Sequence, residues 1–506
     1  MMNKIDYVLD RITMYRLVLY VLIGLIGIAT VLAYFKVLPF SPISLLTSTA
    51  LLVVICWAMN VIMAHVFEVP TNIESPAITA LILALIIDPA QSSGAYSFLG
   101  WAAIIAMCSK YILAIRAKHL FNPAAVAVVI TSFTLGQSAS WWVGTVSMLP
   151  LVLLSGLLIA RKLRQEDMVV SFCAAVMVSV CAVTLLQRGS VFTELNQLLL
   201  QSPLFFFACI MLTEPRTAPP TRHLRRLYGI LTGILFIPQI HIGPIYSTPE
   251  LALVAGNVFS YLVSPKQKVI LRLKRKIKLA PGIIDFVFKP SQKLAFLPGQ
   301  YMEFTLAHPR SDSRGNRRYF TLASSPTEGD MHLGVRFYEQ GSSFKKAMYK
   351  MDGSVKMIGA QTAGDFTLPP NPEQKLVFIA GGIGITPFRS MLKYLLDTQQ
   401  RRDIILFYAN KRVDEVVYRD VLSAAYTKLG VRTFYTLTET TAVPQNWPGL
   451  VGRINEQIIM KAVPDYQERV FYLSGPPDMV RAQEQILKNM KVKNDHIKKD
   501  FFPGLV

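Results

Sequence analysis

The chain has 506 residues, of which 52% are hydrophobic and 17% are charged, and its formal net charge is +20 at pH 7. All five cysteines lie in apolar stretches of the N-terminal half, which excludes a disulfide framework and excludes a cysteine-ligated iron–sulfur cluster in the C-terminal half. The basic residues cluster at the ends of apolar stretches, which favours the cytoplasmic face of a membrane over a nucleic-acid partner.

Residues 1–264 hold the apolar stretches and are predicted to form a polytopic α-helical membrane domain. No small-residue cleavage site follows the first apolar run, so we expect a first transmembrane helix and not a signal peptide. Several stretches reach the ~20 residues that a helix needs to cross a bilayer. About ten spans are expected, at 17–35, 43–66, 76–88, 99–115, 122–135, 142–160, 169–187, 202–213, 227–242 and 249–263.

Basic residues follow the even-numbered spans. Examples are Arg116 after the fourth span, Arg161 after the sixth and Arg222 after the eighth, whereas the segments "DPAQSSGAYS" and "IPQIHIGPIYST" contain no base. This positive-inside pattern predicts a cytoplasmic N-terminus and a cytoplasmic C-terminal half. We therefore expect a multi-pass protein of the bacterial inner membrane, with the lipid bilayer as a partner and no nucleic acid.

Two segments of the apolar half repeat a pattern: "SPAITALILALIIDPAQ" at 75–91 and "SPLFFFACIMLTEPRTA" at 202–218. Three proline pairs share a spacing of 126 or 127 residues: Pro76 with Pro203, Pro89 with Pro215, and Pro123 with Pro249. Five spans in each half would make the repeats inverted, and such repeats place their binding site at the repeat interface. The alternative is a capped helix end followed by positive-inside arginines.

The motifs "KHLFNPAAVAVV", "LTEPRTAPPTR" and "PELALVAGNVFSYLVSP" resemble the B subunit of sodium-translocating NADH:quinone reductase and the D subunit of the Rnf complex, over most of 60–264. The resemblance implies ten helices in two inverted halves and a flavin within the membrane, FMN or riboflavin. The positions that it carries over are Lys118, Asn122, Thr213, Arg216, Thr217 and Thr221. Arg216 could pair with a phosphate or with a reduced-flavin anion.

One motif departs from those subunits. They attach FMN covalently through a Ser-Gly-Ala-Thr loop between the fifth and sixth helices. This chain has "LGQSASWW" there, in which Ser140 is a degenerate candidate acceptor.

The C-terminal half begins with short strand-like segments, "KVILRLKRKIKL", "GIIDFVFKP" and "PGQYMEFTL", which predict a small β-barrel over 265–370. In "RRYFTLASSP", strand alternation puts Arg318 and Phe320 on one face and Thr321 on the other, unless the strand bends. Gly341, Ser342 and Ser343 can open a helix whose amides bind phosphate.

An α/β nucleotide-binding domain is predicted over 371–506. In "KLVFIAGGIGITPFRSML" an apolar strand leads into glycines and then a helix, the arrangement that cradles a pyrophosphate. "IILFYANKR" predicts the next strand, and "VFYLSGPPDMV" a strand, a turn and a helix. Acidic Asp414 and Glu415 beside Lys411 and Arg412 argue against a 2′-phosphate pocket and favour NADH slightly.

Residues 266–506 resemble the ferredoxin-NADP reductase-like flavoproteins through this order of motifs. The resemblance implies that Arg318 holds the FAD pyrophosphate, that Phe320 stacks on the flavin and that Thr321 reaches flavin N5, while Ser474 lies beside the nicotinamide and Phe501 or Phe502 covers the ring. The other positions that it implies for FAD or NAD(P)H are Tyr319, Gly341, Ser342, Ser343, Gly381, Gly382, Gly384, Thr386, Pro387, Gly475 and Pro476.

Together these features predict a membrane-bound NAD(P)H:acceptor oxidoreductase. Electrons would pass from NADH or NADPH to FAD, then to the membrane flavin, and on to a quinone or an extracytoplasmic redox protein.

Two other functions stay open. One is a haem-type transmembrane reductase, although the apolar half has only His65, His119, His223 and His241, and no predicted span carries two. The other is an ion or flavin transporter governed by a nicotinamide-binding domain. We predict no metal site, because Cys108 and Cys209 fit buried small hydrophobic residues better than an iron site.

Overall fold

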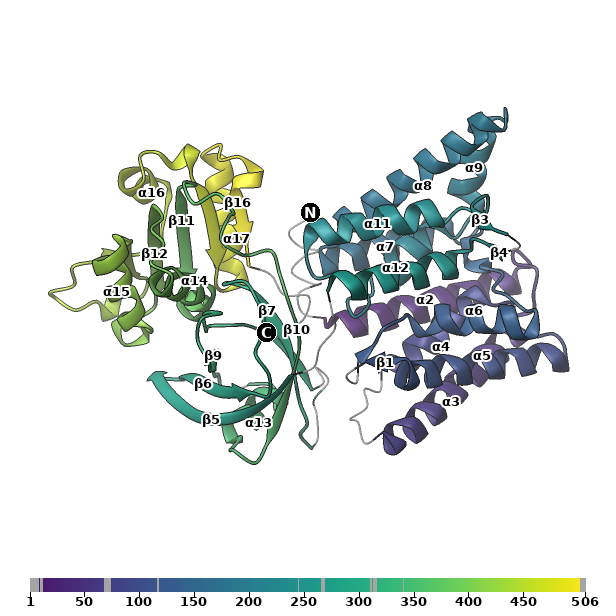
Figure 1. The fold of residues 1–506 in the computed structure, drawn as a ribbon, viewed down its shortest axis with the longest axis horizontal. Helices are drawn as coiled ribbons and strands as arrows, with labels where there is room; N and C mark the ends of the chain where they lie inside the picture. The colour runs from purple at the N-terminus through teal and green to yellow at the C-terminus, as the bar shows by residue number, and fades with distance from the viewer. Residues whose placement is uncertain are drawn as a thin grey trace. The chain divides into compact units, whose positions relative to one another are not determined.

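The computed structural model describes residues 9, 12–67, 74–115, 118–243, 245–264, 269–309, 312, 316–339 and 341–500. The chain divides into two compact units, one reaching residue 268 and the other beginning at Val269. Helices build the first unit, and two sheets with their helices build the second (Figure 1).

The first unit consists of helices and two short hairpins. The helices are α2 (Met14–Tyr34), α3 (Pro42–Val66), α4 (Glu74–Ile86), α5 (Ser93–Ile112), α6 (Pro123–Leu135), α7 (Leu149–Leu163), α8 (Glu166–Leu186), α9 (Val191–Gln201), α10 (Leu204–Phe206), which continues into the π-helical turn η2 (Phe207–Met211), α11 (Arg222–Leu235) and α12 (Pro249–Val263). The hairpins are β1–β2 (Ala114–Ile115 and Lys118–His119) and β3–β4 (His241–Ile242 and Ile245–Tyr246).

Each of the ten predicted spans coincides with a helix, so their helical nature is confirmed. Within the described residues, four helices are long and apolar enough to cross a membrane, namely α2, α3, α5 and α8. A fifth candidate joins α9 to Leu204–Met211 across a bend of 59°. Ten crossings therefore remain a prediction.

Several predicted spans extend beyond their helices: 99–115, for example, includes strand β1 (Ala114–Ile115). The two longest extensions are at 142–160 and 227–242. The segment 142–160 begins with a 3-10 turn, η1 (Trp142–Gly144), and its α-helix starts only at α7, where Pro150 occupies the first turn and favours a helix start. The segment 227–242 leaves the helix at Leu235, three residues before Pro238, which cannot continue it.

The proline repeat of the sequence has a structural counterpart. In the first half α5 is followed by hairpin β1–β2 and then α6, and in the second half α11 is followed by hairpin β3–β4 and then α12. The first hairpin begins at Ala114 and the second at His241, which is the spacing of 127 residues seen between the prolines. The same helix–hairpin–helix order therefore recurs in both halves.

Helices α6 and α12 run antiparallel, as inverted halves require. Asn122 caps the start of α6, and its backbone N–H donates to Oδ1 of Asn257, in the middle of α12, at 2.9 Å. Trp141, which follows α6, donates from Nε1 to Glu250 Oε2 at the start of α12 at 3.1 Å. In each half, the short helix ends near the start of the last helix of the other half. Glu214, which follows η2, accepts from Asn122 at the start of α6. Ile86 O, at the end of α4, accepts from the N–H of Trp141, whose side chain binds Glu250 at the start of α12.

Small residues allow α11 to pack closely on α8. A Cβ added at Gly229 would lie 2.7 Å from Met168 O, and one added at Gly233 would lie 2.7 Å from Phe172 O. Glycines spaced by four residues bring helix backbones together in this way.

The second unit begins with a six-stranded antiparallel sheet. Its strands are β5 (Val269–Ala280), β6 (Ile283–Pro290), β7 (Tyr301–Leu306), β8 (Arg317–Thr321), β9 (Met331–Arg336) and β10 (Lys356–Ala363), and their order is β8-β7-β10-β5-β6-β9. Ala323 N–H donates to His332 O, so the segment after β8 meets β9 from the opposite edge. The sheet thus curls toward the predicted barrel, with helix α13 (Ser343–Lys350) packed against its core.

A parallel six-stranded sheet follows. Its strands are β11 (Leu376–Gly381), β12 (Ile404–Asn410), β13 (Arg432–Leu437), β14 (Leu450–Val451), β15 (Val470–Ser474) and β16 (Ile497–Lys499), and its helices are α14 (Thr386–Asp397), α15 (Arg419–Leu429), α16 (Glu456–Ala462) and α17 (Pro477–Asn489). Helices α14 and α15 share a core with one face of the sheet, and α16 and α17 share a core with the other.

The strand order β14-β13-β12-β11-β15-β16 changes direction between β11 and β15. In doubly wound sheets ligands bind outside the carboxyl ends of the strands at this switch point. The "GGIGITP" turn follows β11 and the "GPP" turn follows β15, so both predicted nucleotide motifs lie at the switch point.

Candidate functional site

Strand β8 carries the predicted flavin residues. Arg318 is 2% exposed and its guanidinium lies 5.4 Å from the ring centre of Phe344 on α13. Phe320 is also directed to α13, with 6.0 Å between its ring centre and that of Phe344. Arg318 and Phe320 therefore share a face, as strand alternation predicted. Phe320 was predicted to stack on the flavin, but its ring packs into the barrel core.

Tyr319 lies on the opposite face of β8. Its hydroxyl donates to Glu303 Oε2 at 2.8 Å, and its ring meets that of Tyr301 edge-on at 5.7 Å. The structure therefore separates Tyr319 from Arg318 and Phe320.

An anion-binding arrangement lies between β8 and α13. Ser342 caps α13 by accepting from Lys345 N, and Ser343 N donates to the Asp312 carboxylate at 2.9 Å. Arg318 Nη2 lies 3.8 Å from the other oxygen of that carboxylate. A helix N-terminus and a buried guanidinium thus already hold an anion, Asp312, between them. This donor set fits the pyrophosphate of FAD.

The glycine turn after β11 requires its glycines. Gly382 has φ 53°, in the left-handed region, and a Cβ at Gly384 would lie 2.5 Å from Ser474 O. Pro387 stands in the first turn of α14. Gly384 therefore allows the glycine turn to approach the β15 turn, where Ser474, Gly475 and Pro476 lie.

A carboxylate joins the two lobes at the switch point. Asp500 Oδ2 accepts from Ser474 Oγ at 2.9 Å and from Thr321 Oγ1 at 3.4 Å. Asp500 N–H donates to Leu473 O at 2.9 Å, which places the residue directly after β16. Sequence reasoning missed Asp500. Its position next to the aromatic pair that was predicted to cover the flavin was the available signal.

Arg336, at the end of β9, was also missed. Its Nη2 pairs with Glu415 Oε1 at 2.8 Å, and a Cβ at Gly382 would lie 3.3 Å from its Nη1. Arg412 Nε lies 3.5 Å from Asp414 Oδ1, and both side chains are about half exposed. Arg336 therefore reaches the glycine turn. Asp414 and Glu415, the two acids expected to oppose a 2′-phosphate, are each paired with an arginine.

The "LTEPRTAPPTR" corner of the first unit forms a polar cluster around Glu214. Glu214 accepts from Asn122 Nδ2 at 3.0 Å and from Thr217 Oγ1 at 3.4 Å, and it lies 3.4 Å from His119 Nε2. Asn257 extends the cluster by donating to Tyr228 OH at 2.9 Å. The structure thus brings two predicted residues, Asn122 and Thr217, together. Glu214, His119, Asn257 and Tyr228 were not among the predicted site residues.

Other predicted residues of this corner lie differently. Thr213 Oγ1 donates to Cys209 O one turn back at 2.7 Å, and Thr221 precedes α11 without capping it through its side chain. Arg216 is half-buried. The Lys118 side chain and Phe501 lie outside the described residues, as does Phe502.

Ser140, the candidate attachment site for FMN, lies near the end of the first repeat segment (75–91) and donates to Asp88 Oδ1 at 2.8 Å. Within the described part of the chain, no group of three or more His, Cys, Asp or Glu side chains is placed to hold a metal ion.

Comparison with known proteins bears on the second unit. Residues 378–485 match the family described as oxidoreductase NAD-binding domain. A flavohemoprotein of Oceanobacillus iheyensis is 27% identical over 241 residues, covering 46% of this chain and 58% of the relative. The NADH-cytochrome b5 reductase 1 of Ajellomyces capsulatus is 26% identical over 254 residues, covering 47% of this chain and 80% of the relative.

The glycine betaine monooxygenase reductase subunit of Chromohalobacter salexigens is 23% identical over 236 residues, covering 46% of this chain and 63% of the relative. The chain thus spans about three fifths of the length of the curated relatives first matched, between 58% and 63%. Among solved structures, the Amycolatopsis cytochrome P450 reductase GcoB has a TM-score of 0.41 at 21% identity, covering 47% of this chain and 71% of that one.

These relatives confirm the prediction of a nicotinamide-dependent oxidoreductase module that resembles FAD-containing reductases. The resemblance of the first unit to membrane subunits of ion-translocating reductases stays a prediction.

Proposed function

We propose that the chain is a membrane-bound NAD(P)H oxidoreductase that passes electrons through FAD to a flavin in the helical unit and on to a quinone or an extracytoplasmic acceptor. The observation that carries the proposal is the shared carboxylate of Asp500, because it joins Thr321 of the barrel to Ser474 of the nucleotide-binding lobe at the switch point. The reductase relatives support the same reading of the second unit.

The chain's residues have distinct parts in this reaction. Arg318 and the Ser343 amide hold the FAD pyrophosphate in place of Asp312, and the glycine turn with Arg336 holds the nicotinamide dinucleotide. When bound, FAD supplies the acceptor for a hydride and releases electrons singly. Asp500 Oδ2 accepts a hydrogen bond from each hydroxyl group, so the oxygen lone pairs of Thr321 and Ser474 stay available to N–H groups of the bound cofactors.

The second flavin is assigned to the Glu214 cluster. The amide, imidazole and hydroxyl groups of the cluster are buried and its carboxylate is half-buried, and such a set suits the polar edge of a flavin better than an apolar tail. The C-terminal half has no cysteine, which favours flavin-to-flavin transfer over an iron–sulfur relay. NADH is the proposed donor, because Asp414 and Glu415 follow β12 and already pair with Arg412 and Arg336, the cations that would otherwise bind a 2′-phosphate.

The test uses purified full-length protein in detergent. Extracted flavins are identified and counted per chain, protein-bound flavin is measured after acid precipitation, and the haem region of the absorbance spectrum is recorded. We expect one FAD, one further flavin, no Soret band, and NADH oxidation coupled to ferricyanide. A single FAD would refute the flavin relay, and a histidine-ligated haem would favour a haem-type reductase.

A further inference from the structure

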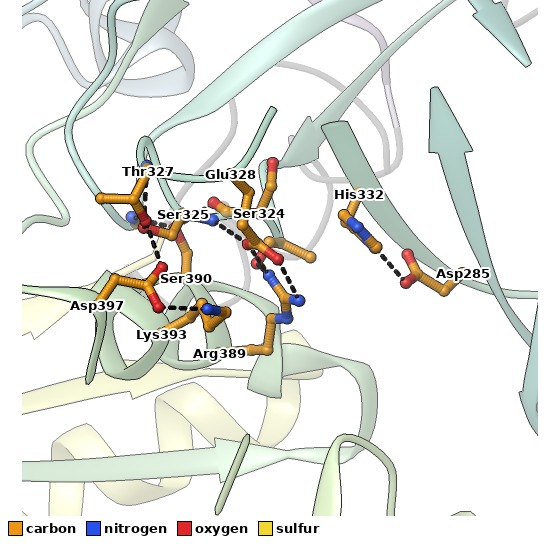
Figure 2. A network of polar contacts seen from close by, with 12 residues as sticks. Asp285, Ser324, Ser325, Thr327, Glu328, His332, Arg389, Ser390, Lys393 and Asp397 are labelled. Atoms are coloured by element: carbon orange, nitrogen blue, oxygen red, sulfur yellow. Dashed lines mark hydrogen bonds and ion pairs between the residues drawn. The ribbon is translucent and has the colours of Figure 1, made fainter. Parts of the chain in front are cut away.

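An ion pair links the two lobes of the second unit at a distance from the Asp500 carboxylate. Arg389, in α14, is 6% exposed and binds both oxygens of Glu328, which lies between β8 and β9. The Nη2–Oε1 distance is 2.8 Å. The same guanidinium donates to Ala323 O at 2.9 Å, so one side chain of the nucleotide-binding lobe holds the barrel segment at two places (Figure 2).

Two further contacts extend this attachment along α14. Ser390 Oγ donates to Ser324 O at 2.6 Å, and Thr327 Oγ1 donates to Asp397 Oδ2 at 2.5 Å (Figure 2). Ser390 and Asp397 are seven residues apart on the helix, which corresponds to a rise of about 10 Å. The segment 323–328 therefore lies along α14 for about two turns.

Each end of the attachment is close in sequence to a part of the proposed reaction site. Ala323 is the second residue after Thr321, and Arg389 is the second residue after Pro387 of the glycine turn motif. A shift of the 323–328 segment against α14 would therefore move the Thr321 hydroxyl relative to the nicotinamide-binding turn.

The groups around Arg389 hold its side chain in one position. Burial would raise the pKa of the Glu328 carboxyl, but the hydrogen bonds and charge of Arg389 outweigh burial and lower it, so the pair is ionised at neutral pH. The Arg389 guanidinium also lies 5.7 Å from the ring centre of Tyr418. His332, whose carbonyl accepts from Ala323 N–H, is held through its ring by Asp285 at 2.7 Å (Figure 2).

Stability alone is a weak reason for such a pair, because well-packed hydrophobic residues of similar volume often stabilise a fold as well as a buried ion pair does. A bidentate guanidinium–carboxylate pair does fix direction and distance. We propose that Arg389 and Glu328 are positioning residues, which hold the flavin-binding strand in register with the nicotinamide-binding turn so that hydride transfer occurs at the productive distance. The proposal rests on the proposed function.

The test measures two quantities separately in full-length detergent-solubilised protein. Equilibrium NADH affinity and FAD content report binding, and the single-turnover rate of flavin reduction by NADH, with its deuterium isotope effect, reports hydride transfer. In Arg389→Met we expect transfer to slow by about 100-fold, the effect of a displacement near 1 Å, while NADH affinity and FAD content stay within about twofold. Arg389→Lys should recover part of the rate, since one ammonium can replace one of the contacts.

Lys393→Met is the matched control. It removes a cation one turn further along α14 that pairs with Asp397 Oδ1. The hydrogen bond from Thr327 goes to the other oxygen of Asp397, so it does not need the lysine and the transfer rate should not change. Should Arg389→Met lose FAD, Glu328→Gln supplies the same comparison with a nearly isosteric change.

Three results would overturn the positioning role. One is an unchanged transfer rate in Arg389→Met. Another is a loss of transfer rate that only follows the loss of FAD in Arg389→Met, Arg389→Lys and Glu328→Gln, which would mean that the ion pair serves the fold alone. If NADH does not reduce a flavin in the unsubstituted protein, the proposed function fails and the positioning role fails with it. The first two results leave the proposed function intact.

Discussion

Ser474 donates a hydrogen bond of 2.9 Å to Asp500, and the same carboxylate oxygen accepts from Thr321 at 3.4 Å. Ser474 ends strand β15, whereas Thr321 ends strand β8 of the other sheet. A single side chain thus fixes two hydroxyl groups that come from different lobes. Removing it should loosen both hydroxyl groups without emptying either binding site.

Asp500→Ala should therefore slow flavin reduction by NADH about 10- to 100-fold, with little change in NADH affinity. Asp500→Asn keeps one acceptor oxygen and should lose less. Stopped-flow absorbance of the flavin measures the rate. Asp495→Ala, an exposed acid of the same segment, is the control and should behave as the unsubstituted protein. Equal rates in Asp500→Ala and the control would remove Asp500 from the site.

Replacing Arg318 by alanine should weaken FAD binding, because the pyrophosphate loses a buried charged donor. A charge-assisted hydrogen bond contributes about 1.5–3 kcal/mol, which corresponds to about 10- to 100-fold in the FAD dissociation constant. NADH:ferricyanide activity should return when FAD is added in excess. Arg317→Ala, the neighbouring cation that approaches Glu303 at 4.0 Å, should retain FAD. Failure of added FAD to restore Arg318→Ala would point to a folding defect instead.

Local pattern accounts for what the sequence could predict. Long apolar stretches located helices at all ten expected spans, and the strand–glycine–helix order located β11, its turn and α14. Contacts between distant residues leave no such pattern. Thr321 and Asp500 are 179 positions apart, and Arg389 and Glu328 are 61 apart, so only folding reveals that they meet. Alternation likewise predicted the shared face of Arg318 and Phe320 but not the burial of Phe320 in the barrel core.

The Glu328 pair should make stability depend on pH. The pKa of Glu328 is lowered in the folded protein, so its contribution is fully present above the unfolded value of about 4.3 and is lost as the pH falls through the folded value. Glu328→Gln should lower the free energy of unfolding by about 3 kcal/mol at pH 7, because Arg389 loses its charged partner. Urea unfolding is followed by flavin fluorescence at pH 7 and at a series of pH values below about 4.3, where the difference from the unsubstituted protein should shrink as the pH falls. A difference that grows in acid would contradict the assignment.

Dinucleotide preference should depend on Asp414. NADH should be preferred over NADPH by about 10-fold or more in kcat/KM, since a 2′-phosphate would meet the acids that follow β12. Asp414 Oδ1 lies 3.5 Å from Arg412 Nε. Asp414→Arg removes one acid and frees Arg412 from this pair, so the preference for NADH over NADPH should become smaller. Asp420→Arg makes the same charge change at an exposed position of α15 and should leave the ratio unaltered. An unchanged ratio in Asp414→Arg would place the ribose elsewhere.

The Glu214 cluster should govern the second flavin alone. Glu214→Gln keeps the shape of the side chain but removes the charge that faces His119 and Asn122, so we expect about 10-fold lower occupancy of the second flavin with FAD still at one per chain. Ferricyanide can take electrons from FAD directly, so NADH:ferricyanide activity should persist while reduction of a quinone analogue falls. Glu194→Gln, an acid on α9 away from this corner, is the control. If Glu214→Gln loses both activities together, the substitution has disturbed the fold. If it loses neither activity and keeps both flavins, the second flavin binds elsewhere.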